Sequence, residues 1–220
     1  MKKIILLLLI IIPVLLISNI KNKNTCYTSI GDGYSKGIDS YGQINGYSKL
    51  LKKHLSNKKL LNNYTNLSNK DMSINTLYTN ILLNKNNIKR ILSETEILTI
   101  SIGLNDLKYK LSINNINDYK LNKIMKEINI DINKLLKEIS KYYKGTIYVI
   151  GYYYKDYDDI YLVKGIKELN NLYRNKKVCF IYSEKLQKNN KYYLNNPNNN
   201  YPNIEGYKLI ELKLLKKLEK

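Results

Sequence analysis

Apolar residues follow two alternating patterns along the chain. Short apolar runs typical of buried strands cover residues 26–33, 60–68, 96–103, 145–153 and 177–183. Segments with apolar residues three and four positions apart predict helices over 46–55, 74–83, 119–143, 160–174 and 205–220. Strands that alternate with helices need crossover connections, so we predict a three-layer α/β/α domain with a mostly parallel sheet of about five strands.

The N-terminus, MKKIILLLLIIIPVLLISNIKNKN, departs from this alternation. Two lysines precede an apolar run from Ile4 to Ile17, and a polar stretch follows. A signal-peptide core has about 7–15 apolar residues and a spanning helix about 18 or more, so the run lies between the two. Leu16 stands where a cleavage site needs a small residue. We therefore predict a signal peptide or N-terminal membrane anchor over 1–22, with an extracytoplasmic domain over 23–220.

Candidate chemistry gathers in three loops. Parallel sheets bind ligands at the carboxyl ends of their strands. Two of the loops, IGDGYSKG (30–37) and SIGLNDL (101–107), directly follow predicted strands, and NPNNNYPNIEGYKLI (196–210) leads into the last helix. We expect all three at one edge of the sheet.

Together the three blocks resemble the SGNH, or GDSL, family of esterases and lipases. In that family the blocks read Gly-Asp-Ser, Gly-x-Asn-Asp, and Asp-x-x-His-Pro-Asn followed by Gly-Tyr before a C-terminal helix. This chain has GDG at 31–33, GLND at 103–106 and NNNYPNIEGY at 198–207, in the same order and contexts. The resemblance implies the SGNH-hydrolase fold, with a flavodoxin-like sheet in the order 2-1-3-4-5.

The resemblance also implies that the catalytic triad is substituted. The serine position falls on Gly33, the histidine position on Tyr201 and the carboxylate position on Asn198, with Asn199 as a second candidate. Acyl transfer needs a nucleophile beside a base of near-neutral pKa. Glycine has no side chain, and tyrosine, with an ordinary pKa of about 10, stays protonated at neutral pH. We therefore expect a catalytically inactive relative of these hydrolases.

Part of the oxyanion hole remains by the same resemblance. Its donors would be the side-chain amide of Asn105 and the backbone N–H of Gly33. The family's third donor, a glycine of the second block, has no counterpart, and its place falls near Lys70 or Asp71.

Three more residues of these blocks carry structural roles in the family: Asp32, Gly103 and Asp106. No further Asp, Glu, His or Cys joins the two aspartates at ligand spacing. We therefore expect neither a metal nor another cofactor.

Two residues are considered as replacements for the triad. Ser35 lies two positions after Gly33, and His54 is the only histidine. His54 lies about eight residues into a helix, roughly 12 Å from the sheet edge, so we predict a surface or partly buried helix residue. Ser35 is predicted to cap the turn. An active esterase with Ser35 as relocated nucleophile is one alternative function, and a structural protein of the cell envelope is another.

The large net positive charge does not identify a specific binding partner. Lys and Arg outnumber Asp and Glu by 37 to 18, a formal net charge of +19. Lys, Asn, Ile and Tyr have A/T-rich codons, and the lysines are spread along the whole chain, so we expect generic attraction to polyanions and no specific nucleic-acid partner. By analogy with family substrates, the expected ligand is an ester- or acetyl-bearing glycan or lipid. The oligomeric state stays open.

The 22 tyrosines and two cysteines raise separate questions. The tyrosine-rich segment 151–161 is either a stacking platform for sugars or a product of codon bias. One disulfide between Cys26 and Cys179 would suit an exported protein. In the implied strand order, however, the two lie about 14 Å apart against a limit of about 7 Å, so we predict two buried, unpaired thiols.

Overall fold

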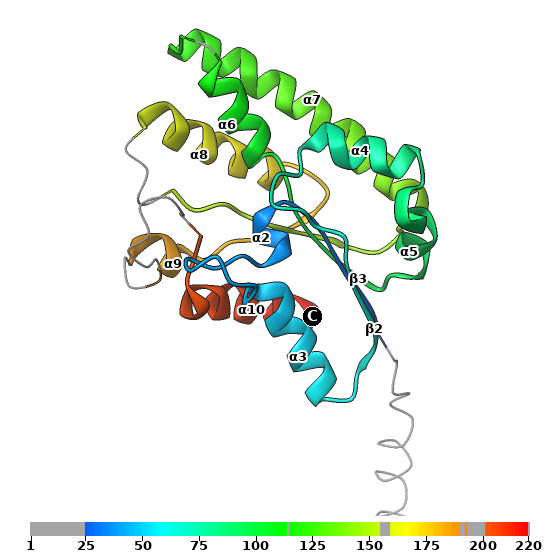
Figure 1. Cartoon of the computed structure of the whole chain (residues 1–220). Helices are drawn as coiled ribbons and strands as arrows, with labels where there is room; N and C mark the ends of the chain where they lie inside the picture. The colour runs from blue at the N-terminus through cyan, green and yellow to red at the C-terminus, as the bar shows by residue number, and fades with distance from the viewer. Residues whose placement is uncertain (1–24, 114, 155–158, 190–191, 193–200, 220) are drawn as a thin grey trace, which may run out of the picture.

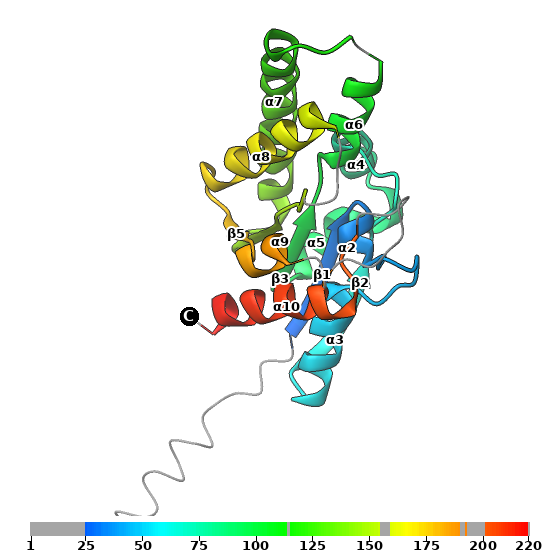
Figure 2. The same ribbon diagram turned by 90° about the vertical axis from the view of Figure 1, so that its left-hand side faces the viewer.

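Five parallel strands form the centre of the protein. The computed structural model describes residues 25–113, 115–154, 159–189, 192 and 201–219. The strands are β1 (Thr25–Gly31), β2 (Leu61–Asn66), β3 (Ile97–Ser101), β4 (Ile147–Ile150) and β5 (Cys179–Ile181). They form one sheet in the order β2-β1-β3-β4-β5, and every neighbouring pair is parallel (Figure 2). The predicted strand number and order are confirmed.

Helices cover both faces of the sheet (Figure 1). One layer contains α4 (Ile74–Leu82), α5 (Ile88–Glu94), α6 (Leu104–Ser112), α7 (Asp118–Tyr142) and α8 (Ile160–Arg174). The other contains α3 (Tyr47–Asn57) and α10 (Ile204–Leu218), which pack against each other. Three shorter elements complete the described residues: α2 (Gly33–Lys36), the 3-10 helix η1 (Lys85–Asn87) and α9 (Glu184–Lys188). The three-layer α/β/α architecture is thus confirmed.

The structure contains four short helices that the sequence did not predict. These are helices α2, α5, α6 and α9, which have four to nine residues. Two turns of helix show too little periodicity to stand out from a loop. The block at 101–107, predicted as a loop, becomes helical at Leu104, after Gly103 takes a left-handed conformation with φ of 109°.

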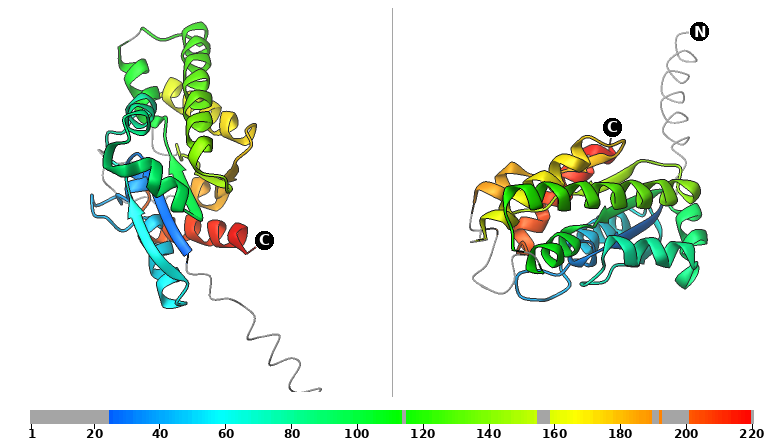
Figure 3. Two further views of the ribbon diagram at one scale, coloured as in Figure 1. Left: turned by 90° about the vertical axis from the view of Figure 1, so that its right-hand side faces the viewer. Right: turned by 90° about the horizontal axis from the view of Figure 1, so that it is seen from above.

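The core lies where helix stripes meet the central strands. Ile30, Leu98, Ile100 and Val149, on the three central strands, are completely buried. Helix α7 is the long green helix in Figure 3. It buries a stripe at the expected spacing of three and four: Leu121, Ile124, Met125, Ile128, Ile132, Leu135 and Ile139. This packing holds the carboxyl ends of the strands in place.

Gly31 brings the ends of β1 and β3 close together. Its φ is 123°, a conformation that side chains rarely adopt. A Cβ there would lie 2.9 Å from the carbonyl carbon of Ser101 and closer still to the oxygen. The same approach lets the Asp32 N–H donate to the Ser101 carbonyl at 2.9 Å. A glycine at this position is therefore a steric requirement of the sheet edge.

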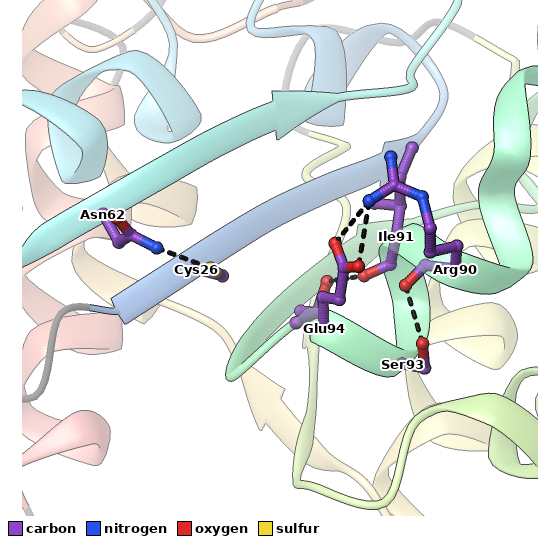
Figure 4. Close-up of polar contacts among 7 residues, drawn as sticks. Cys26, Asn62, Arg90, Ile91, Ser93 and Glu94 are labelled. Carbon is purple, nitrogen blue, oxygen red and sulfur yellow. Dashed lines mark hydrogen bonds and ion pairs between the residues drawn. The ribbon is translucent and has the colours of Figure 1, made fainter.

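The two cysteines are free, as predicted, because β3 and β4 lie between their strands. The expectation that they are buried is wrong, since both are only half-buried. Cys26 and Cys179 stand at the amino-terminal ends of β1 and β5, where the helical layers cover the sheet less completely. Asn62 approaches the Cys26 sulfur from the edge strand at 3.6 Å (Figure 4).

The predicted signal peptide or anchor at 1–22 lies outside the described residues. In the part of the chain that the structure does describe, no helix combines the length and apolar character needed to cross a bilayer.

Candidate functional site

Hydrogen bonds join the loops after β1, β2 and β3 at the carboxyl edge of the sheet. The N–H of Asn69, after β2, donates to the Gly31 carbonyl at 2.9 Å. Both carboxylate oxygens of Asp106, on α6 after β3, accept from the N–H of Ile74 at 3.0 and 3.2 Å. Asp106 therefore links the first turn of α6 to α4, and burial raises its pKa above the usual value. These loops form one rim, which we call the carboxyl rim.

The segment before α10 joins the same rim. The Ser40 N–H, shortly after α2, donates to the Pro202 carbonyl at 3.2 Å. The Asn203 side chain caps α10 by accepting from the Gly206 N–H at 3.0 Å. The half-buried Tyr201 packs its ring 5.3 Å from that of Tyr34 on α2. Two of the three predicted triad positions, Gly33 and Tyr201, are thus brought together.

The Tyr201 ring occupies the space that a side chain at position 33 would need. An ideal Cβ on Gly33 would lie 2.6 Å from Cζ of Tyr201, 3.0 Å from Cε1 and closer still to the hydroxyl oxygen. Such separations are far below van der Waals contact. The glycine and the tyrosine are therefore sterically complementary, and a side chain at position 33 would require the hydroxyl end of the Tyr201 ring to move.

We expect Gly33→Ala to destabilise the protein by about 1–3 kcal/mol, because the new methyl group displaces the Tyr201 ring. In Gly33→Ala/Tyr201→Ala the cost should shrink, giving a coupling of about 1–2 kcal/mol in a double-mutant cycle from urea unfolding. The matched cycle pairs Gly33→Ala with Tyr41→Ala, at a tyrosine 69% exposed, and should be additive. Equal coupling in both cycles, or none in either, would contradict the contact.

Asp32 is the buried polar centre of the rim. Its carboxylate accepts from the Ser101 hydroxyl at 2.7 Å, the Tyr34 N–H at 3.1 Å and the Tyr152 hydroxyl. Burial raises the pKa of Asp32 to about 6, and these hydrogen bonds oppose that rise. Burial likewise raises the pKa of Tyr152 well above its usual value. The group caps α2 and fixes the end of β1, a structural role of the kind that the resemblance implied.

Asn105 points its amide at the loop after β2. Its Nδ2 donates to the carbonyls of Lys70 at 2.9 Å and Met72 at 3.0 Å. A flipped amide would set its oxygen against two carbonyl oxygens, so the contacts fix the orientation. Since an amide has two N–H donors, both are engaged here. At the second-block position Lys70 presents a carbonyl oxygen to Asn105, and an oxyanion role for Asn105 stays a prediction that would require release of these bonds.

The two candidate replacements, Ser35 and His54, do not form a nucleophile–base pair with each other. Ser35 is completely buried, and its oxygen contacts the Tyr47 hydroxyl at 3.0 Å and accepts from the Ser101 N–H at 2.8 Å. His54 is partly buried on α3, as predicted, with Nδ1 4.0 Å from a Glu211 oxygen. Ser35 cross-links α2, α3 and β3 and does not cap the turn as predicted.

Three other sequence expectations have mixed outcomes. Asn198 and Asn199 lie outside the described residues. Tyr152 and Tyr153 of the tyrosine-rich segment are buried, so they are not a surface platform for sugars. Among the described residues no three His, Cys, Asp or Glu side chains gather as metal ligands would. The expectation of no cofactor stays a prediction.

Several solved structures with a similar fold are lipases or esterases by name. No protein-family model and no curated protein matches the sequence. The lipase Lip_vut3 from a goat rumen metagenome is similar with a TM-score of 0.72 at 16% identity, over 88% of this chain and 97% of that one. A member of the lipolytic protein G-D-S-L family from Veillonella parvula matches with a TM-score of 0.61 at 17% identity, over 89% and 99%. The acetylxylan esterase Axe2 from Geobacillus stearothermophilus matches with a TM-score of 0.62 at 14% identity, over 90% and 97%.

The chain has the SGNH, or GDSL, hydrolase fold. At these identities the likeness concerns the fold, and the chemistry rests on the residues of the carboxyl rim. In this SGNH fold Gly33 and Tyr201 lie side by side. The sequence motifs predict the nucleophile position at Gly33 and the base position at Tyr201.

Sequence reasoning missed the polar network beneath the rim. Ser101, Tyr47 and Tyr152 hold Asp32 and Ser35, although none lies within the three family blocks at 31–33, 103–106 and 198–207. Ser101 directly follows the strong apolar run of β3, and a polar residue at the end of a buried strand is a usable signal for such a role.

Proposed function

We propose that this chain is an exported, non-hydrolytic relative of the SGNH esterases that binds an ester- or acetyl-bearing surface glycan or lipid. One observation carries the proposal: the Tyr201 ring fills the space where the nucleophile would stand on residue 33. A triad needs a side-chain nucleophile with a base beside it, and the two residues in contact here are a glycine and a tyrosine. Export rests on the apolar N-terminal run, and the ligand class on analogy with esterases of the same fold.

The orientation of Asn105 supports loss of catalysis independently. Stabilisation of an oxyanion needs donors aimed at the developing charge. Here the amide donates to two backbone carbonyls, and those oxygens would repel an anion. The polar groups of the rim therefore bind one another.

A cavity of about 420 Å³ beside α2 supports ligand binding. Its lining combines apolar and cationic groups, including Ile44, Tyr64, Lys36 and Lys52. The volume lies within the range of small-molecule sites, about 300–1,000 Å³. An acylated glycan or an anionic lipid would find both apolar contacts and positive charge there.

The alternative of an active esterase requires Ser35 to attack a carbonyl. Ser35 is completely buried, and its hydroxyl contacts Tyr47 and Ser101, neither of which is a base at neutral pH. Burial raises the pKa of Tyr47 to about 12, so that hydroxyl stays protonated at neutral pH and cannot accept the serine proton. The structure supplies no imidazole at this serine, because His54 contacts Glu211 on α10.

We expect the purified full-length chain to hydrolyse p-nitrophenyl acetate no faster than its Ser35→Ala variant. We also expect Ser35→Ala to lower the free energy of unfolding by about 1–3 kcal/mol, since the Ser101 N–H and the Tyr47 hydroxyl lose a partner. The measurements are initial rates and urea unfolding. Turnover by the wild type that disappears in Ser35→Ala would overturn the proposal in favour of the enzyme.

The ligand class is tested separately on arrays of acetylated glycans and on lipid strips. Binding to acetylated but not deacetylated glycans, or to one lipid class, supports the proposal. Blank arrays together with specific capture of a cell-envelope protein would favour a structural role instead.

A further inference from the structure

A second cavity, of about 460 Å³, lies between α8, α9 and the end of β5. Figure 2 shows these elements beside one another at the β5 edge of the sheet. None of its described lining residues is a triad position or a residue of the lysine-lined cavity beside α2. We call it the β5 cavity, and its chemistry is independent of the proposed function.

Arg174 supplies a fixed positive charge to the β5 cavity. Its guanidinium carbon lies 5.0 Å from the ring centre of Phe180 and 5.2 Å from that of Tyr182, and these two rings are nearly parallel. Contact with two rings restrains the position of the guanidinium group. Its Nη1 donates to Asn171 Oδ1 at 3.0 Å, and no described carboxylate forms an ion pair with it.

The chain's other arginine, Arg90, does form an ion pair with a carboxylate. Arg90, on α5, donates from Nη1 to both carboxylate oxygens of Glu94 at 2.9 Å (Figure 4). Arg90 and Arg174 are the only arginines in the chain. One is therefore neutralised on its own helix, whereas the other faces a cavity without a described carboxylate partner.

Gln187 adds an oriented neutral donor. Its side-chain oxygen accepts from the Tyr154 N–H at 3.1 Å and contacts the Tyr182 hydroxyl at 3.2 Å. The backbone donor fixes which end of the amide is oxygen. Consequently the two N–H groups of Gln187 point away from these partners, and no described residue accepts from them.

The charges that face the β5 cavity are unbalanced. Lys167, with Nζ 5.1 Å above the Tyr154 ring, forms no ion pair with a described residue. Lys188 lies 3.8 Å from Glu184, the single acidic group among the described lining residues. Among the described lining residues, three cations stand against one carboxylate, and the Gln187 amide adds two further N–H donors.

We propose that the β5 cavity binds a small anion rich in oxygen atoms, of monosaccharide size, such as a sugar phosphate or a sugar acid. Arg174 and Lys167 contact the anionic group, and the Gln187 amide donates to it or to a neighbouring hydroxyl. Planar, bidentate contact with carboxylate or phosphate is the geometry for which an oriented guanidinium is suited.

The test is isothermal titration of the full-length chain with glucose 6-phosphate, glucuronate and glucose. We expect glucose 6-phosphate or glucuronate to bind and glucose to bind at least about tenfold more weakly, and the stronger of the two acids identifies phosphate or carboxylate as the preferred group. Arg174→Gln should weaken binding by about tenfold or more, because an oriented charge is lost. Arg90→Gln removes the same formal charge elsewhere and should leave affinity unchanged.

Gln187→Glu provides a nearly isosteric check. The glutamate keeps an acceptor for the Tyr154 N–H but replaces two donors with an anionic oxygen, so affinity should fall by about tenfold or more while the melting curve stays similar. Equal weakening by Arg90→Gln and Arg174→Gln would show generic attraction to a basic protein and overturn the site. Absence of binding by both acids, or equally tight binding of glucose, would overturn it as well.

Discussion

The variant Gly33→Ser/Asn198→Asp/Tyr201→His is expected to hydrolyse p-nitrophenyl acetate about 10²–10³-fold faster than the wild-type chain. The exchange at 201 removes the ring that fills the space beside residue 33, and it places an imidazole there. The new serine then has both room and a base, and the new aspartate orients the base. The gain stays below that of a natural triad, because the Asn105 amide remains bonded to the second-block carbonyls.

Initial rates measure this gain, and a fluorophosphonate probe reports the activated serine directly. Gly33→Ser alone is the matched control: it supplies the serine but keeps a tyrosine at position 201, which is not a base at neutral pH, so it should remain inactive and unlabelled. A correctly folded triple variant that neither turns over ester nor reacts with the probe would count against assignment of these positions to a lost triad.

Asp32→Asn should change the pH dependence of stability more than any other single carboxyl exchange at the rim. The pKa of Asp32 is about 6 in the fold against 3.8 for the unperturbed group, so the fold favours the protonated form. Its contribution to stability is therefore complete below about pH 4 and is lost as the pH rises through about 6. The total is about 3 kcal/mol, of which about 2 kcal/mol falls between about pH 4.5 and 7.5.

Urea unfolding across this pH range measures the effect as the difference in unfolding free energy between wild type and Asp32→Asn. The wild type should lose about 2 kcal/mol relative to the variant as the pH rises. Asp71→Asn, at an exposed carboxyl after β2, is the matched control because it leaves the buried network intact. A constant difference between wild type and Asp32→Asn would show that Asp32 is not the group that titrates.

The sequence predicted the sheet well because each strand and long helix carries its own periodic signal. Runs such as 96–103 stand out as buried strands, and the helix at 119–143 repeats its apolar stripe over seven turns. The four unpredicted helices have no such length. Helix α6 depends on the left-handed Gly103 and on tertiary contacts, which a local pattern does not contain.

For the site, the motifs predicted which residues would meet but not how they would use their atoms. The approach of Gly33 to Tyr201 follows from strand order and loop position. The orientation of the Asn105 amide depends on where the loop after β2 places two carbonyls, and the burial of Tyr152 depends on Asp32, 120 residues away. Such partners come together only through the tertiary fold.

The separation of the two thiols has a practical consequence. With β3 and β4 between the strands of Cys26 and Cys179, no covalent bond ties the ends of this domain together. Its native state therefore needs no oxidant or disulfide isomerase to form. Protein for the experiments above can be refolded in the presence of a reductant, which keeps both half-buried thiols from cross-linking one molecule to another.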